Sequence, residues 1–138
     1  VYEDSCLEVF FAPFIDEAAY LNVEMNPNGA FLSQVGAARD DRVFVKALTS
    51  LAPQVTVLAP ERGWGVEWVL SNVLLSAAFD RPFFAAPGMY RGNFYKCGDK
   101  TPTPHYAAFA PVSTLPPGFH APEHFATIMI REESLWNH

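Results

Sequence analysis

The stretch Cys6-Leu-Glu-Val-Phe-Phe-Ala-Pro13 decides the fold class. It contains β-branched and aromatic residues, ends in proline, and alternates its side chains between two faces, which predicts a buried strand that carries the carboxylate of Glu8. Residues 20–27 alternate in the same way and lead into the turn sequence Pro27-Asn-Gly29, where glycine supplies a positive φ. We therefore expect the two strands to form a hairpin.

Further strands are expected wherever a short apolar run lies between Gly, Pro or Asn residues. Ser71 is a suitable N-cap for a short helix that ends before Pro82. Short strands with one brief helix predict a β-sandwich or barrel rather than an α/β fold. The additional strands are expected at residues 55–58, 64–70, 91–97 and 125–130, with a turn at 61–63.

Three segments give weaker signals. Residues 30–50 combine a helical spacing in their first part with a strand-like pattern at 42–46, so both interpretations stay open. Residues 82–90 are expected to form a loop. The proline-rich residues 102–122 are expected to be irregular, because proline interrupts both helices and sheets.

The composition describes one globular domain that covers residues 1–138. The chain is 50% apolar and has twelve Phe, five Tyr and three Trp, which is enough for a core and excludes disorder. The net charge is −6 and the nine basic residues are scattered, which argues against nucleic acid as a partner. No apolar run approaches the roughly 18 residues that a membrane-spanning helix needs, so we expect no membrane insertion.

Several residues could support chemistry. His120 and His124 are four residues apart, but Pro122 lies between them and makes a shared helical metal site a weak hypothesis. Glu8 and Glu67 each lie mid-strand among apolar neighbours, where burial could raise a pKa toward acid–base use, although hydrogen bonding across a sheet would explain them equally well. The aromatic surplus favours sugar binding, since flat rings stack on sugars, but core packing is the default for any single ring.

Five strings, taken in order, resemble one family, the carbohydrate-binding domains related to the family-9 carbohydrate-binding module, and the resemblance extends over nearly the whole chain. The resemblance implies an Ig-like antiparallel β-sandwich with no catalysis of its own. It also implies that sugar is held between aromatic rings, with calcium as a structural ion in some members. The strings are Tyr2-Glu-Asp-Ser-Cys-Leu-Glu-Val-Phe-Phe-Ala-Pro13, Tyr20-Leu-Asn-Val-Glu-Met-Asn-Pro-Asn-Gly29, Gly63-Trp-Gly-Val-Glu67, Arg91-Gly-Asn-Phe-Tyr-Lys-Cys-Gly-Asp99 and Phe119-His-Ala-Pro-Glu-His-Phe125.

The resemblance also implies the residues of the sugar slot. The first ring falls on Tyr2, and the strand carboxylate that accepts sugar hydroxyls falls on Glu8. The second ring is usually a tryptophan in relatives and falls here on Phe109, so the clamp is expected to be smaller. Asn26, Asn28 and His105 are further polar candidates near the slot.

The family further implies a context. We expect a secreted, periplasmic or cell-surface protein that supports polysaccharide degradation, fused to or associated with a glycoside hydrolase. Relatives carry some tens of residues before the first quoted strand, so early strands of the sandwich are expected to be missing from this sequence. Relatives have the same Trp-to-Glu pair at Glu67 without being hydrolases, so no enzyme activity is expected. Cys6 and Cys97 lie on adjacent strands in relatives, and both a disulfide and free thiols remain open.

Two other functions compete with sugar binding. Sandwich domains of related shape can hold haem through Met, His or Lys ligands. A ligand-free interaction scaffold is the second alternative. The side chains available to a haem are Met25, Met89, Lys96 and His105.

Overall fold

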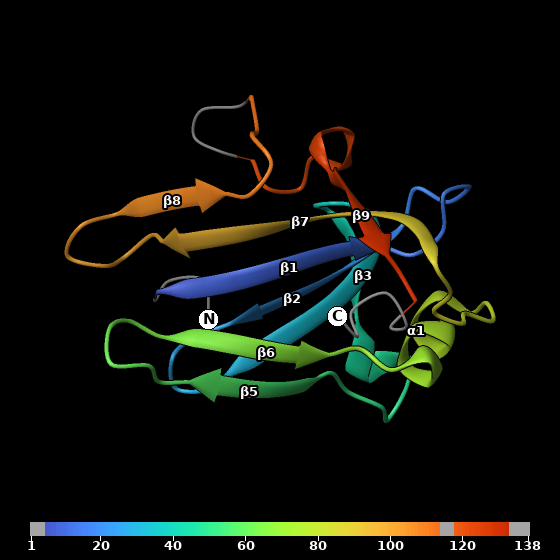
Figure 1. Ribbon diagram of the computed structural model, residues 1–138, viewed down its shortest axis with the longest axis horizontal. Helices are drawn as coiled ribbons and strands as arrows, with labels where there is room; N and C mark the ends of the chain where they lie inside the picture. Colours follow the sequence, from blue (N-terminus) through green and yellow to red (C-terminus); the bar gives the residue numbers. More distant parts are fainter. Residues whose placement is uncertain (1–4, 114–117, 133–138) are drawn as a thin grey trace.

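The computed structural model describes residues 5–113 and 118–132 and shows two antiparallel sheets with one short helix (Figure 1). This arrangement confirms the predicted all-β sandwich. The elements are β1 (Cys6–Ala12), β2 (Tyr20–Met25), β3 (Phe31–Ala38), β4 (Asp41–Phe44), the 3₁₀ turn η1 (Val45–Ala47), β5 (Gln54–Leu58), β6 (Gly65–Val69), α1 (Asn72–Phe79), β7 (Gly88–Gly98), β8 (His105–Ala108), η2 (Pro122–His124) and β9 (Ala126–Ile130).

Strand β1 lies at the centre of the large sheet. This sheet has the order β4-β3-β2-β1-β7-β8, and β9 pairs with the first half of β7. The predicted hairpin of β1 and β2 is confirmed, with Glu8 directly opposite Glu24. On its other side β1 pairs with β7, which places Cys6 opposite Cys97 and Glu8 opposite Tyr95. The second sheet is the β5–β6 hairpin, as predicted from the turn at 61–63.

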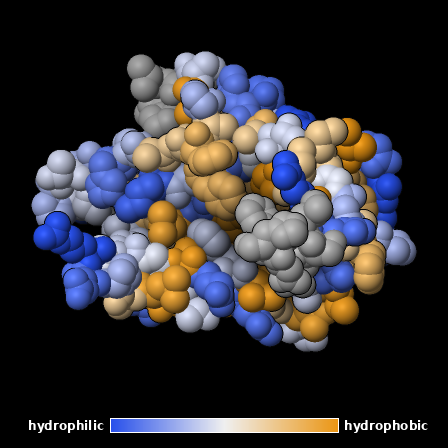
Figure 2. All heavy atoms as spheres, in the orientation of Figure 1, coloured by the Kyte–Doolittle hydropathy of each residue, from blue (hydrophilic) through white to orange (hydrophobic). Residues whose placement is uncertain are grey.

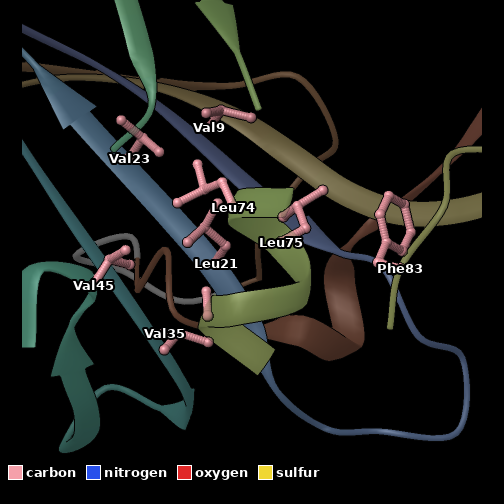
Figure 3. Close-up of a cluster of buried hydrophobic side chains, with 9 residues drawn as sticks. Val9, Leu21, Val23, Val35, Val45, Leu74, Leu75 and Phe83 are labelled. Atoms are coloured by element: carbon pink, nitrogen blue, oxygen red, sulfur yellow. The ribbon is translucent and has the colours of Figure 1, made fainter. Parts of the chain in front are cut away.

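One face of the large sheet carries an apolar cluster that α1 and the β5–β6 hairpin cover. Val9, Leu21 and Val23 on this face pack against Leu74 and Leu75 of α1 (Figure 3). The β5–β6 hairpin closes the same layer, since its inward-facing side chains contact this cluster. Each buried side chain of this size contributes about 1.5–3 kcal/mol to folding. On the outside of the molecule, in the same view as Figure 1, apolar and polar residues are interspersed (Figure 2).

The opposite face has a closed half and an open half. In the closed half Phe10 packs edge-on against Tyr95, with ring centroids 4.9 Å apart, and Phe125 covers both Phe10 and Tyr20. Phe119 stacks on Tyr95 at 4.2 Å between ring centroids. The segment after β8 therefore covers this half of the sheet. The other half, near the start of β1, carries polar side chains and is not closed by any of the residues that the structure describes.

Ser71 caps α1 as predicted. Its side-chain oxygen accepts a hydrogen bond from the backbone N–H of Leu74 at 3.1 Å, which satisfies one of the free donors of the first turn. The helix ends at Phe79, before Pro82, and Asp80 adopts a left-handed conformation after it. Within the described residues, no helix has the length and apolar character needed to cross a membrane.

The structure decides three segments whose sequence signals were weak. Residues 30–50, for which helix and strand were both open, form β3, β4 and the 3₁₀ turn η1, because β3 pairs along its length with β2 and buries alternate side chains. The expected loop at 82–90 ends early, since β7 begins at Gly88, where β9 supplies its hydrogen-bonding partner. The expected irregular segment 102–122 contains β8, which lies between prolines at the edge of the sheet, where proline is tolerated.

Candidate functional site

A cavity of about 520 Å³ occupies the open half of the polar face. Strands β1, β2, β7 and β8 contribute to it, together with the turn between β3 and β4 and the segment near residue 119. Its volume falls within the roughly 300–1,000 Å³ that is usual for small-molecule sites. The side chains that define its chemistry are Glu8, Glu24, Arg42, Asp99, Tyr106 and Phe119.

Two buried carboxyls form the floor of this cavity. Glu8 is 5% exposed and Glu24 is 6% exposed, and the strand register places them side by side. Burial, together with the charge of Glu24, raises the pKa of Glu8 well above its usual value. Burial also raises the pKa of Glu24, while Arg42 opposes this effect. Glu24 Oε1 accepts a hydrogen bond of 2.9 Å from Asn22 Nδ2, which fixes the orientation of its carboxyl group.

Two buried thiols adjoin Glu8. Cys97 Sγ donates a hydrogen bond of 3.1 Å to Glu8 Oε1, and Cys6 lies opposite Cys97 across the strand pair. No disulfide joins the two cysteines. Contact with Cys6 and burial both raise the pKa of the Cys97 thiol. The cluster does not fit calcium, which takes about 6–8 oxygen ligands, because it offers two sulfurs and one carboxylate.

A basic wall stands beside the carboxyl floor. Arg39 and Arg42 lie at the β3–β4 turn, and Arg42 Nε donates a hydrogen bond of 2.8 Å to the Arg39 carbonyl. His120 completes this wall, and its Nδ1 lies 2.8 Å from the Tyr20 hydroxyl oxygen. Burial and the two arginines lower the pKa of His120 to about 3. The imidazole is therefore neutral at physiological pH and offers one donor and one acceptor nitrogen.

An aromatic wall lies on the β8 side of the cavity. The Tyr106 ring is partly exposed, and its hydroxyl donates a hydrogen bond to Asp99 Oδ1. Tyr106 and Phe119 pack edge-on, with ring centroids 6.3 Å apart. The cavity therefore combines carboxyl acceptors, guanidinium donors and aromatic surface within one rigid frame.

Of the residues predicted for the slot, Glu8 lies in this cavity. Phe109 is 73% exposed and packs edge-on against Phe94, with ring centroids 6.0 Å apart, and it does not line the cavity. Phe94 faces the same side of the sheet as Val9, whereas Tyr106 faces the side of Glu8. Phe109 and Glu8 are thus not brought together. Tyr2 lies outside the described residues.

The three further polar candidates also lie away from the cavity. Asn26 is buried, and its Oδ1 accepts hydrogen bonds of 3.1 Å from the backbone N–H groups of Asn28 and Ala30. Asn26 therefore holds the turn after β2, and Asn28 is exposed in that turn. The exposed His105 accepts a hydrogen bond of 2.7 Å from Lys96 Nζ. None of the three residues lines the cavity, and a role for them in sugar binding stays a prediction.

The alternative sites are not assembled either. Glu67 is exposed on the β5–β6 hairpin, so the expectation that it is buried is wrong. Met25 is fully buried, whereas Met89 is 70% exposed, so these two potential haem ligands do not share an accessible site. His120 contacts Tyr20, while His124 Nε2 lies 2.9 Å from Ser113 Oγ. The two histidines thus bind different partners.

Sequence reasoning missed most of the cavity. The sequence contained a signal for Glu24. It lies two residues from Asn22 in β2, so alternation places both side chains on the same face, and the predicted hairpin places Glu24 opposite Glu8. Arg39, Arg42, Tyr106 and Phe119 come from segments whose structure was left open or was expected to be irregular. Asp99 lies two residues after the predicted strand at 91–97, and for His120 the sequence suggested only a weak metal site shared with His124.

Comparisons with known proteins identify the family and support the fold. The model of carbohydrate-binding family 9 matches residues 1–130. The fold is similar to the crystal structure of a candidate carbohydrate-binding protein from Bacteroides uniformis ATCC 8492, with 31% sequence identity and a TM-score of 0.72. The match covers 94% of this chain but 62% of that protein, so this chain spans less than two thirds of its length. No curated protein matches the chain.

Proposed function

Since the chain belongs to carbohydrate-binding family 9, we propose that it binds carbohydrate in the cavity above Glu8 and Glu24 and does not convert it chemically. The observation that carries this proposal is the pair of buried carboxyls at the floor of an open cavity. Buried carboxyls need polar partners, and the hydroxyls of a sugar supply them.

The cavity walls match the two kinds of surface on a sugar ring. The carboxyls of Glu8 and Glu24 accept hydrogen bonds from hydroxyl groups, and Arg42 donates to hydroxyl oxygens. A hydrogen bond to a charged group contributes about 1.5–3 kcal/mol, and a neutral one about 0.5–1.5 kcal/mol. The rings of Tyr106 and Phe119 offer apolar surface to the C–H face of the sugar, worth about 0.5–1.5 kcal/mol per ring pair beyond area burial. A few such contacts give micromolar to millimolar affinity.

The biological role in this proposal is to hold a protein on a polysaccharide. The family is a non-catalytic kind of domain, and the resemblance points to secreted or surface proteins that degrade polysaccharides. We therefore propose that the chain acts outside the cytoplasm, fused to or beside a glycoside hydrolase. Release of sugar from chromogenic glycosides that disappears in a Glu8→Gln variant would contradict the non-catalytic assignment.

Calorimetry against a panel of neutral and acidic oligosaccharides tests the proposal. We expect one ligand class to bind, and Glu8→Gln or Glu24→Gln to weaken that binding by at least about tenfold, because each replaces a carboxyl oxygen that can accept a hydrogen bond from a sugar hydroxyl with an amide nitrogen that can only donate. Glu67→Gln is the matched control, since this exposed carboxylate lies on the other sheet. Flat titrations across the panel would favour an interaction scaffold. Equal affinity of Glu8→Gln and Glu67→Gln would place the sugar elsewhere.

The aromatic contacts need a separate experiment. Tyr106→Ala and Phe109→Ala each remove one partly or largely exposed ring, but only Tyr106 lines the cavity. We expect Tyr106→Ala to weaken binding more than Phe109→Ala. A larger loss in Phe109→Ala would instead support the slot between Tyr2 and Phe109 that the family resemblance implies.

A further inference from the structure

We propose that Cys6, Cys97 and Glu8 form a binding site for a thiophilic divalent cation of the zinc class, at the floor of the cavity. The metal site shares Glu8 with the proposed sugar site, but it depends on the two cysteines, to which the sugar proposal gives no role, so metal binding and sugar binding can fail separately in the experiments below. Three observations carry it: the placement of the side chains by the sheet, the spacing of their ligand atoms, and their access to the cavity.

The sheet places the three side chains on one face. Cys6 and Glu8 are two residues apart on β1, so strand alternation points both to the same side. Cys97 is the cross-strand partner of Cys6 on β7, which is the central strand's neighbour. Three ligands on two hydrogen-bonded central strands are held without any loop, so the geometry is set before an ion arrives.

The spacing of the ligand atoms fits a small ion. The two sulfur atoms and one carboxylate oxygen all lie within 4.8 Å of one another, and Cys97 Sγ lies 3.1 Å from Glu8 Oε1. Around tetrahedral zinc, bond lengths of about 2.0–2.3 Å place neighbouring ligand atoms roughly 3.5–3.8 Å apart. The observed spacing brackets this range, so small side-chain rotations suffice to close the site.

The donor set selects the class of metal. Two thiolates with one carboxylate favour zinc and its soft analogue cadmium, whereas calcium and magnesium prefer oxygen ligands. Cys6 is fully buried, Cys97 is 2% exposed and Glu8 is 5% exposed, so the ion would be shielded from bulk water on the sheet side.

The cavity gives an ion access to the three ligands and leaves room for a fourth ligand, such as water. Glu8 and Cys97 both line it, so an ion can reach them from solvent. Three protein ligands with an open position are typical of zinc sites that bind water or an added ligand. Two thiolates, one carboxylate and a divalent ion leave one net negative charge, which faces the arginine wall formed by Arg39 and Arg42.

Cadmium titration of the reduced protein tests the proposal. After chelator treatment and reduction, we expect one Cd²⁺ per chain to produce a thiolate-to-metal charge-transfer band in the ultraviolet, and Zn²⁺ to remove that band by competition. Cys6→Ala and Cys97→Ala should each weaken binding by at least about 100-fold, because even indirect partners of metal ligands contribute about 10–100-fold. Glu8→Gln should weaken it less but measurably, whereas Glu67→Gln serves as the unchanged control.

A second measurement keeps the proposal testable if a cysteine variant does not fold. In the unmodified protein, bound Zn²⁺ should protect both thiols from alkylation, which mass spectrometry detects as two unmodified cysteines. Binding to Cys97→Ala that equals that of the unmodified protein would overturn the proposal. Alkylation of both thiols at the same rate with and without Zn²⁺ would overturn it too. If the protein contains a Cys6–Cys97 disulfide, a reduced protein that still binds no metal would also overturn the proposal.

Discussion

The two faces of the β1–β2 hairpin carry opposite kinds of side chains on the same backbone. Toward α1, the hairpin presents Val9, Leu21 and Val23, all of which are buried in the apolar layer. Toward the cavity, it presents Glu8 and Glu24, which are equally buried but polar. Because strand side chains alternate, one residue of displacement in register would exchange the two sets. The apolar set therefore fixes the register, and the register places the carboxyls.

The polar face repeats this contrast along its length. Its closed half buries Phe10 and Tyr20 beneath Phe125, whereas the half that holds Glu8 has no such cover among the described residues. The same strands thus serve as core at one end and as a site at the other. What separates the two ends is the cover that Phe119 and Phe125 provide over the closed half.

The largest effect is expected from the apolar face. Leu21→Ala removes a fully buried side chain from the layer beneath α1. We expect the free energy of unfolding to fall by about 2–5 kcal/mol, from lost burial and the cavity left behind. Urea denaturation measures this loss.

Glu24→Gln tests the polar face of the same strand, since Glu24 lies three residues after Leu21 on β2. The amide keeps the shape of the side chain and an oxygen for the hydrogen bond from Asn22, so we expect stability to change by less than about 1 kcal/mol. Sugar affinity should fall. If folded Leu21→Ala protein loses sugar affinity as strongly as Glu24→Gln does, the two faces are not separable.

A loss of stability smaller than that of Leu21→Ala, together with a loss of sugar binding, is expected from a change at Gly36. A Cβ atom at this position would lie 1.7 Å from the backbone oxygen of Asp41, so the β3–β4 turn that carries Arg39 and Arg42 would have to shift. We expect Gly36→Ala to cost about 1–3 kcal/mol of stability and to weaken sugar binding. Gly65→Ala is the matched control, because its Cβ would meet only Leu58 Cβ at 3.9 Å. Equal effects of the two changes on unfolding and binding would contradict this reading of the turn.

The sequence predicted the arrangement of the strands better than it predicted the residues of the cavity, and the reason is physical. Alternation in residues 6–12 and 20–25 is a local property, and it yielded the hairpin and the buried position of Glu8. The arginine wall depends on a turn in residues 30–50, where local signals were balanced and pairing with β2 decided the outcome. The aromatic wall depends on β8, which was not predicted because the prolines around it indicated irregular structure. Phe109 was assigned by resemblance, which gives no side-chain direction, and alternation places Tyr106 rather than Phe109 on the side of Glu8.

Acid is expected to act on the polar face through His120. Its pKa is about 3, below the ordinary value of 6.5, because of burial and then the nearby arginines. Between these two values the unfolded chain binds more protons than the folded one, so stability is fully present above about pH 6.5 and declines as the pH falls toward 3. The imidazole is partly open to the cavity, so we expect a loss on the order of 1–2 kcal/mol.

Stability measured against pH checks this expectation. His120→Gln should show a shallower decline between pH 6.5 and 3 than the unmodified protein does, since it lacks the titrating ring. An NMR titration follows the ring directly. An imidazole that titrates near pH 6.5 in the folded protein would show that water reaches it freely and that the arginines have little effect.

The smallest effect is expected at the cap of α1, and it sharpens the comparison because it acts through one face alone. Ser71→Ala removes the acceptor for the Leu74 N–H and should lower stability by about 1 kcal/mol, within the usual range of about 0.5–2 kcal/mol for an N-cap. Ser71→Asp should restore most of this loss, because aspartate caps equally well and its charge is favourable at a helix N-terminus. Sugar affinity should stay the same in both variants, since α1 covers only the apolar layer. If sugar affinity falls in Ser71→Ala and recovers in Ser71→Asp, the stability of the helix affects the positions of Glu8 and Glu24 on the opposite face of the sheet.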